Sequence, residues 1–262
     1  MAETKSFSIG NVTLANRFVE GPMAGFTDLP MRSLAFASGA SLAYTEMISA
    51  NAWAYDSPET QRMVTDTQKD KGPVALQLFG YEISHIETAI DWVEAHGKYA
   101  FLDFNLGCPV PKVMKQNAGS HLLLDLDYLY TLMRAIVVRS KHPVVAKTRL
   151  GFTDPDDIVK IVKVLEDAGV SAIAIHGRTR NEFYAGQPHY DEIAKAKAVA
   201  TVPVIANGNI DDSNAFAVME ETKADAVMIA RKALGNPLVF ANLIRKEKGL
   251  APLELTFAEQ EH

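Results

Sequence analysis

Eight short apolar runs recur along the 262-residue chain, with helix-length segments between them. Runs that are apolar throughout, rather than alternating, are typical of parallel strands buried on both faces. The intervening segment 156–168 carries Ile158, Ile161, Val162 and Leu165 at helical spacing. Eight such units predict an α/β fold of the (β/α)8 type, a TIM barrel, better than an open sheet. The predicted strands are 17–21, 42–45, 73–78, 101–105, 143–148, 172–176, 203–207 and 226–230.

A short apolar stub precedes the first run. Residues 7–9 and 12–14 flank Gly10 and Asn11, a pair that favours a tight turn between antiparallel strands. We expect this N-terminal β-hairpin to plug the floor of the barrel. No linker or low-complexity stretch follows it, so the chain is predicted to form one barrel domain over residues 1–250 with a short tail over 251–262.

The overall charge bears on possible partners and location. A net charge of −6 and an isoelectric point near 5.7 give no general attraction to nucleic acid, so such a contact needs a local basic surface. The sequence has no secretory signal and no run near the ~18 apolar residues of a membrane span. We therefore expect a cytoplasmic protein without a membrane partner. The single cysteine, Cys108, excludes an internal disulfide and fits a reducing compartment.

Polar residues gather where the predicted strands end. In a barrel these carboxyl ends meet at one mouth, where catalytic residues lie. Cys108 follows one of these ends, although a lone cysteine is more often a small buried hydrophobe than a catalyst. The seven histidines are scattered rather than clustered with carboxylates, which argues against a metal site. The polar residues at or just after the strand ends are Glu46, Gln77, Asn105, Lys147, Arg149, His176, Asn207 and Arg231.

Two features at this mouth indicate an anionic ligand. Gly208 and Ala230 follow the last two runs, where barrels of this kind commonly hold a phosphate on main-chain N–H groups, and Arg231 adds a cation. The same small residues also suit tight turns, and the residues alone leave both interpretations open. Lys147 ends an apolar run and is costly to bury without an electron-rich partner such as the edge of a flavin.

With these residues assembled, the sequence resembles the bacterial tRNA-dihydrouridine synthases, and most of all their B type. The resemblance spans residues 8–253, and the segment DFNLGCPVPKV, in register with the other motifs, is its most specific part. The matching segments are 22–28 (PMAGFTD), 46–47 (EM), 77–80 (QLFG), 103–113 (DFNLGCPVPKV), 118–120 (AGS), 147–151 (KTRLG), 176–180 (HGRTR), 203–208 (PVIANG) and 228–237 (MIARKALGNP).

The resemblance implies a function and a set of site residues. It implies that the barrel domain binds flavin mononucleotide (FMN), which NADPH reduces, and that the enzyme reduces the C5–C6 bond of uridines in tRNA. Cys108 would be the catalytic acid that protonates C5, because a thiol with a pKa of about 8.5 is mostly protonated near neutral pH. Asn105, Arg149 and Arg178 would bind the uracil. The residues implied for FMN are Pro22, Met23, Ala24, Gln77, Lys147, His176, Asn207, Gly208, Asn209, Ala230 and Arg231.

The chain departs from the family pattern in two places. Asn209 stands where the family usually has aspartate, which removes a negative charge near the cofactor. The family normally continues into a C-terminal helical domain that grips tRNA, and this sequence stops short of it, so we expect weak tRNA binding. Two alternatives stay open at this point. One is an FMN barrel of the dihydroorotate dehydrogenase or ene-reductase kind that acts on a free small molecule, and the other is a flavin- or RNA-binding protein with little turnover.

Overall fold

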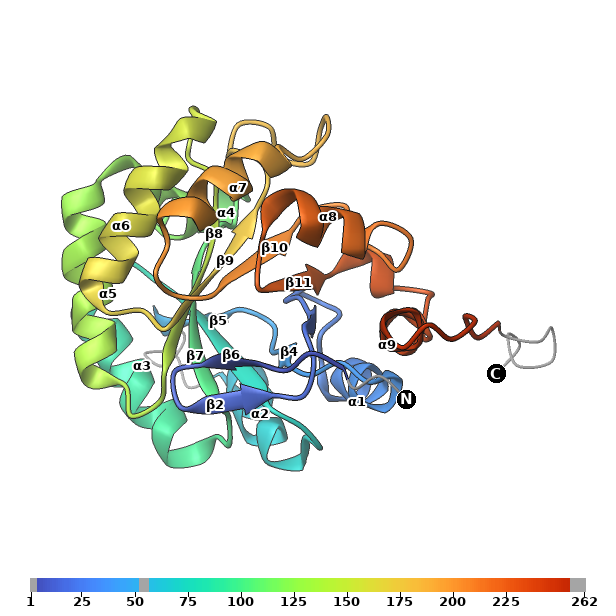
Figure 1. The fold of residues 1–262 in the computed structure, drawn as a ribbon. Helices are drawn as coiled ribbons and strands as arrows, with labels where there is room; N and C mark the ends of the chain where they lie inside the picture. Colours follow the sequence, from blue (N-terminus) through green and yellow to red (C-terminus); the bar gives the residue numbers. More distant parts are fainter. Residues whose placement is uncertain (1–3, 52–56, 255–262) are drawn as a thin grey trace.

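The computed structural model describes residues 4–51 and 57–254. Its main feature is a nearly closed ring of parallel strands (Figure 1) in the order β3-β11-β10-β9-β8-β7-β6-β4. A single parallel bridge between Val19 and Leu42 joins the two ends of the ring. The ring strands are β3 (Phe18–Glu20), β4 (Ala43–Tyr44), β6 (Val74–Phe79), β7 (Phe101–Leu106), β8 (Val144–Arg149), β9 (Ala172–His176), β10 (Val204–Asn207) and β11 (Ala226–Ile229).

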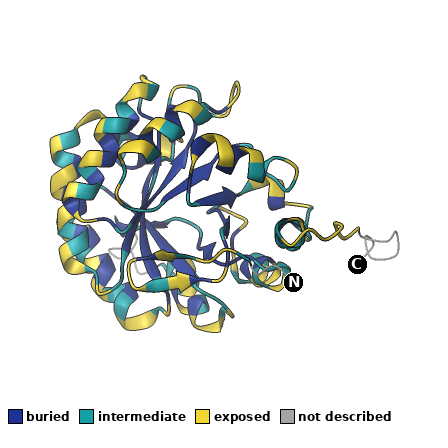
Figure 2. Ribbon diagram, viewed as in Figure 1, coloured by how far each residue is buried: buried dark blue, intermediate teal, exposed yellow. Residues whose placement is uncertain are grey.

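Helices surround the ring on its outer side, and Figure 2 shows buried strands inside and exposed helix faces outside. Helix α6 illustrates the pattern, because Ile158, Ile161, Val162 and Leu165 are buried while the opposite face is solvated. The helices are α1 (Leu29–Ser38), α2 (Pro58–Thr65), α3 (Ile83–His96), α4 (Pro111–Met114), α5 (Leu126–Arg139), α6 (Ile158–Ala168), α7 (Tyr190–Val199), α8 (Ala215–Thr222) and α9 (Val239–Glu247). Short 3-10 helices are η2 (Asp66–Lys69), η3 (Gly119–Leu124), η4 (Pro155–Asp157) and η5 (Arg231–Ala233).

The hairpin of β1 (Phe7–Ile9) and β2 (Val12–Leu14) closes the amino-terminal end of the ring. Ile9 and Leu14 pack in one buried cluster with residues such as Phe101 and Ala172, the first residues of β7 and β9. Since this apolar plug fills one end, a ligand reaches the barrel interior only from the carboxyl ends of the strands.

The predicted barrel and its hairpin are confirmed, and each predicted strand agrees with the observed one to within about a residue at either end. The structure adds β5 (Ile48–Ser49), which pairs with β6 and was not predicted. Asp156 and Asp157, predicted as helical, lie in η4 ahead of α6. Within the described ranges, no helix combines the length and apolar character that crossing a membrane requires. Of the predicted tail, residues 255–262 lie outside the described part.

Candidate active site

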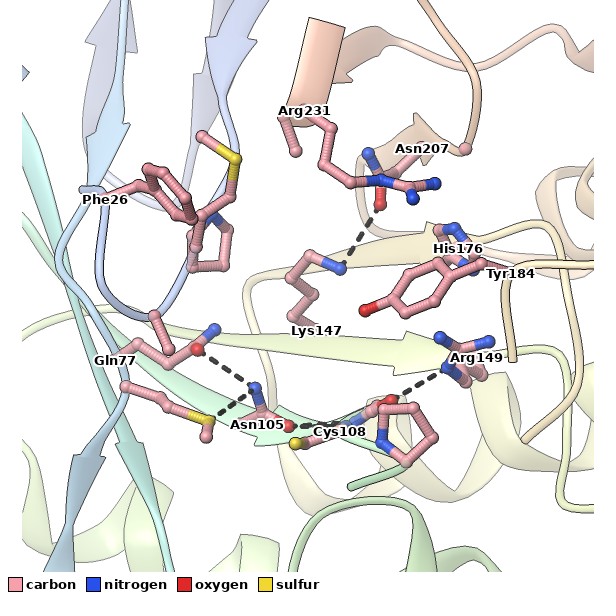
Figure 3. A pocket seen from close by; sticks show the side chains of 18 of the residues that line it. Phe26, Gln77, Asn105, Cys108, Lys147, Arg149, His176, Tyr184, Asn207 and Arg231 are labelled. Atoms are coloured by element: carbon pink, nitrogen blue, oxygen red, sulfur yellow. Dashed lines mark hydrogen bonds between the residues drawn. The ribbon is translucent and has the colours of Figure 1, made fainter. Parts of the chain in front are cut away.

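A cavity of about 730 Å³ opens at the carboxyl ends of the strands (Figure 3). Its walls come from nearly every strand end, so residues far apart in sequence meet there. The lining residues are Pro22, Met23, Ala24, Phe26, Met47, Gln77, Asn105, Gly107, Cys108, Pro109, Val110, Lys147, Arg149, His176, Tyr184, Asn207, Gly208, Asn209, Ile210, Ala230, Arg231, Lys232 and Leu234.

All eleven residues predicted to hold a cofactor line this cavity. The predicted catalytic residue Cys108 and two of the predicted substrate residues, Asn105 and Arg149, line it as well. The residues that were predicted at the strand ends therefore lie together in the cavity wall. Asn209, the departure from the family pattern, adopts a left-handed backbone with φ of 50°, a conformation that asparagine tolerates better than most residues.

Arg178 is the exception, and its expected place on the substrate side of the cavity is not what the structure shows. Its side chain is buried and does not line the cavity. Nε donates to the Ala185 carbonyl at 2.8 Å and Nη2 to the Gly186 carbonyl at 2.6 Å. These two bonds turn the guanidinium back toward its own loop, so Arg178 holds the loop after β9 in place.

Sequence reasoning missed Phe26, Met47 and Tyr184. Tyr184 lies on the loop after β9, and the Cζ atoms of Arg231 and Arg149 lie 4.3 Å and 5.3 Å from its ring centroid. Such cation–π contacts stabilise each guanidinium against the ring face. No periodicity marks a loop aromatic, and the only signal was an aromatic residue close behind the His-Gly-Arg motif.

The Cys108 loop is fixed by hydrogen bonds on both sides. The Asn105 carbonyl oxygen Oδ1 accepts from the main-chain N–H groups of Gly107 at 3.1 Å and Cys108 at 2.9 Å. The Cys108 carbonyl accepts from the N–H and hydroxyl of Ser120 at 3.1 Å and 3.0 Å. Burial raises the pKa of the Cys108 thiol, and Arg149 only partly opposes this. A thiol held in this way stays protonated at neutral pH and is suited to donate a proton.

Lys147 presents a cationic group from β8 to the centre of the cavity (Figure 3). Its Nζ donates to Asn207 Oδ1 at 3.3 Å, and Asn207 Nδ2 donates in turn to the Met228 carbonyl at 2.8 Å. Burial, assisted by the charge of Arg149, lowers the pKa of Lys147 to about 8. An ammonium group that burial destabilises in this way gains from an anionic or electron-rich ligand.

The end of the cavity near β9, β10 and β11 carries the imidazole of His176 and the guanidinium of Arg231. His176 Nδ1 is buried and has no hydrogen-bond partner within the described residues. Burial, followed by the charges of neighbouring cations that include Lys147 and Arg231, lowers the pKa of His176, so the imidazole is neutral at pH 7. Gly208 has φ of 122°, and an added Cβ would lie 3.3 Å from Pro188. This turn therefore requires glycine, and Gly208 lines the cavity.

The described residues do not form a metal site as they form this cavity. Within residues 4–51 and 57–254, no group of three or more His, Cys, Asp or Glu side chains lies close enough together to hold a metal ion. The charged and polar side chains that line the cavity are instead cations, amides, the His176 imidazole, the Tyr184 phenol and the Cys108 thiol.

Comparison with solved structures agrees with the fold. Morphinone reductase in complex with tetrahydroNAD superposes with a TM-score of 0.66 at 13% sequence identity, covering 99% of this chain and 94% of that chain. A mutant of the same reductase in the same complex gives a TM-score of 0.68 at 12% identity, with the same coverage of both chains. At this level of identity the likeness concerns the barrel architecture alone.

Comparison of sequences identifies the family. The chain is 39% identical over 255 residues to tRNA-dihydrouridine synthase B of Vibrio cholerae, which covers 96% of this chain and 78% of that protein. It is 37% identical over 268 residues to probable tRNA-dihydrouridine synthase 1 of Synechocystis, covering 98% and 74% respectively. The family model for dihydrouridine synthase (Dus) matches residues 19–260. The motif resemblance is thus confirmed, and the chain is an oxidoreductase of the dihydrouridine synthase family.

Proposed function

We propose that this protein reduces uridine in tRNA to 5,6-dihydrouridine, with FMN as its bound cofactor, NADPH as the reductant and Cys108 as the proton donor. One observation carries the proposal: a single cavity brings together a protonated thiol, a buried lysine and, beside other cations, a buried histidine nitrogen that has no hydrogen-bond partner among the described residues. Membership of the family indicates the class of substrate. The side chains of the cavity are of the types that this reaction needs.

The residues present fit a flavin phosphate. His176 Nδ1, which has no hydrogen-bond partner in the described part of the chain, is a polar atom whose burial is costly without a ligand. Arg231 would add a charge and Gly208 a main-chain N–H group, as phosphate sites in barrels use. A cavity of about 730 Å³ lies in the range of cofactor-sized sites. When bound, FMN supplies the hydride that reduces the substrate.

Other residues that line the cavity would hold the flavin ring and donate the proton. Lys147 and Gln77 would hydrogen-bond the edge of the flavin ring, where Lys147 stabilises negative charge. Pro22, Met23 and Ala24 would cover one side of it. Proton donation falls to Cys108, whose raised pKa keeps the thiol loaded at neutral pH.

Arg149 and Asn105 would hold the uracil. Arg149 is fixed by donating to the carbonyls of Gly107 at 2.8 Å, Thr179 at 2.9 Å and Phe183 at 2.7 Å. A charge fixed at the wall stabilises negative charge that develops on the uracil oxygens during reduction. Asn105 Nδ2 keeps one N–H that faces only Met47 Sδ at 3.9 Å, a weak acceptor that a ligand oxygen replaces. The base reaches this depth only when it is extruded from the RNA stack.

The test is direct. Protein saturated with FMN should show a bound-flavin absorbance spectrum and, with NADPH, form dihydrouridine in unmodified tRNA, detected by nucleoside mass spectrometry. Protein that neither retains nor binds FMN contradicts the cofactor assignment. Flavin-loaded protein that consumes NADPH but leaves unmodified tRNA unchanged contradicts the substrate assignment.

A further inference from the structure

A chain of side-chain hydrogen bonds runs from the barrel interior to the Cys108 loop. Asp103 is fully buried on β7 and does not line the cavity. Its Oδ2 accepts from Gln77 Nε2 at 2.6 Å, and Gln77 Oε1 accepts from Asn105 Nδ2 at 2.9 Å. Asn105 Oδ1 then accepts the N–H groups of Gly107 and Cys108, and Figure 3 shows the last part of this path.

We propose that Asp103 is a positioning residue, which fixes the direction of this hydrogen-bond chain and thereby the placement of the Cys108 thiol. The inference rests on the proposed role of Cys108 as proton donor. Asp103 does not line the cavity, and its hydrogen bonds reach the Cys108 loop through the amides of Gln77 and Asn105, which both line it.

The direction of the chain follows from what each group can do. A side-chain amide has one donor end and one acceptor end, whereas a carboxylate only accepts. Asp103 therefore requires the NH₂ of Gln77 to face it, which leaves the Gln77 oxygen for Asn105. Asn105 must then present its own oxygen to the two main-chain N–H groups. Both ends of the chain demand the same orientation, so the two amides are locked against flipping.

The protonation state of Asp103 does not break this order. Burial raises the pKa of Asp103 to about 7, opposed by the Gln77 hydrogen bond and by Lys147. Its other oxygen, Oδ1, has no partner in the described part of the chain, so a proton placed there leaves Oδ2 as the acceptor for Gln77. The chain thus holds the loop across the neutral pH range.

The experiment compares Asp103→Leu, which removes the acceptor, with Asp103→Asn, which keeps an acceptor oxygen of the same shape. Because Cys108 is the only cysteine in the sequence, alkylation by iodoacetamide reports this thiol alone. Asp103→Leu should change the alkylation rate about tenfold and slow uridine reduction at least as much, while NADPH still reduces the bound flavin. Asp103→Asn should restore both rates to within about threefold of wild type.

Thr222→Val provides the matched control. Its buried hydroxyl donates to the Val218 carbonyl at 2.7 Å and accepts from Ala224 N at 3.2 Å, remote from the cavity lining. This variant should lose stability without any change in Cys108 alkylation. If Asp103→Leu does not fold, the smaller strand-forming Asp103→Val makes the same comparison.

Three results overturn the inference: wild-type alkylation and reduction rates in the apolar variant, failure of Asp103→Asn to restore them, or the same change in Thr222→Val. Alkylation does not depend on turnover. A protein that reduces no uridine but shows the predicted alkylation pattern contradicts the proposed function and leaves the positioning by Asp103 standing.

Discussion

At the scale of single residues, burial acts in opposite senses on Cys108 and Lys147, two of the titrating groups that line the cavity. It raises the pKa of the Cys108 thiol and so keeps its proton in place. It lowers the pKa of Lys147 to about 8, so the ammonium form persists at neutral pH but is lost just above it. The same desolvation thus prepares an acid for donation and a cation for an anionic ligand.

Lys147→Met should weaken FMN binding by about 10- to 100-fold, because a hydrogen bond to a charged group contributes ~1.5–3 kcal/mol. In wild type, binding should also weaken as pH rises above about 8, since deprotonation removes the ammonium charge. Titration of FMN by fluorescence quenching measures both effects. The exposed Lys163→Met is the control and should bind as wild type. Equal FMN affinity in Lys147→Met and wild type at every pH would disprove the role of this lysine.

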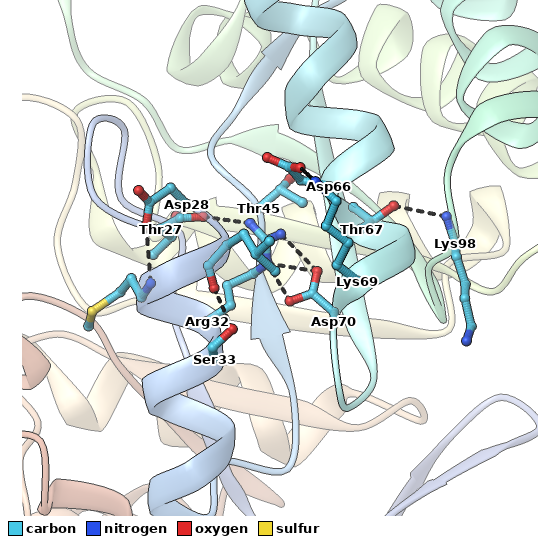
Figure 4. A network of polar contacts seen from close by, with 12 residues as sticks. Thr27, Asp28, Arg32, Ser33, Thr45, Asp66, Thr67, Lys69, Asp70 and Lys98 are labelled. Carbon is cyan, nitrogen blue, oxygen red and sulfur yellow. Dashed lines mark hydrogen bonds and ion pairs between the residues drawn. The ribbon is translucent and has the colours of Figure 1, made fainter.

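At the scale of secondary-structure elements, a buried ion pair joins α1 to the residue that follows η2 (Figure 4). Arg32 on α1 pairs with Asp70 at 2.7 Å, with side chains only 3% and 1% exposed. Arg32 also donates to the Thr27 carbonyl at 2.8 Å, which fixes the loop that carries the cavity residues 22–24. Glu20 at the end of β3 is fully buried, and neither carboxyl oxygen has a partner within the described residues.

Glu20 should make the protein less stable as pH rises. Burial raises its pKa from 4.5 to about 8, with Arg32 opposing, so the folded state holds a proton that the unfolded state releases. This stability is fully present below 4.5 and lost as pH rises through about 8. Glu20→Gln cannot ionise, so its melting temperature should match wild type near pH 4.5 and exceed it at about pH 9 by several degrees.

Thermal melts at the two pH values measure this difference. The control Glu220→Gln changes an exposed carboxylate that pairs with Lys223, and it should show no such gain at high pH. Identical pH dependence in Glu20→Gln and wild type would mean that Glu20 is charged in the folded protein at neutral pH.

The elements also show what sequence can predict. The ring strands are apolar on both faces. This pattern is visible in a single sequence, so the positions of the strands were predictable. The cavity residues at strand ends were predictable because barrel geometry brings those ends together. Tyr184 and Phe26 escaped because loop conformation has no period. Arg178 lies outside the cavity wall, and this was not predictable because a motif shows that an arginine follows β9 but not that its guanidinium turns back to carbonyls of its own loop.

At the scale of the whole molecule, the net charge of −6 repels the phosphates of RNA. Attraction for RNA must therefore come from basic side chains around the cavity. Arg149 and Arg178 are buried there, which leaves Lys112, Lys115, Arg231 and Lys232 as the exposed cations in or beside the cavity wall. Few phosphates can be neutralised by so small a set.

Unmodified tRNA should therefore bind weakly, with a shallow dependence on salt. Because Arg231 is proposed to hold the flavin phosphate, three of these cations remain for the RNA, and three phosphate contacts give a slope of log affinity against log salt of about −2 to −3. Titrating labelled tRNA at several salt concentrations measures the slope. Lys112→Ala should reduce the magnitude of the slope by about 0.7–0.9, the contribution of one phosphate contact. Tight binding at physiological salt with a slope steeper than about −6 would show that a larger basic surface engages the RNA.

The central claim is that this cavity couples a bound flavin to proton donation by Cys108. The most direct measurement reduces the FMN-loaded protein with NADPH without oxygen, adds unmodified tRNA and follows the return of oxidised-flavin absorbance. In Cys108→Ala, reduction by NADPH should proceed as in wild type, while reoxidation by tRNA should slow by ~10²–10⁴-fold, the usual contribution of a general acid. Reoxidation of the variant by tRNA at the wild-type rate would contradict the account.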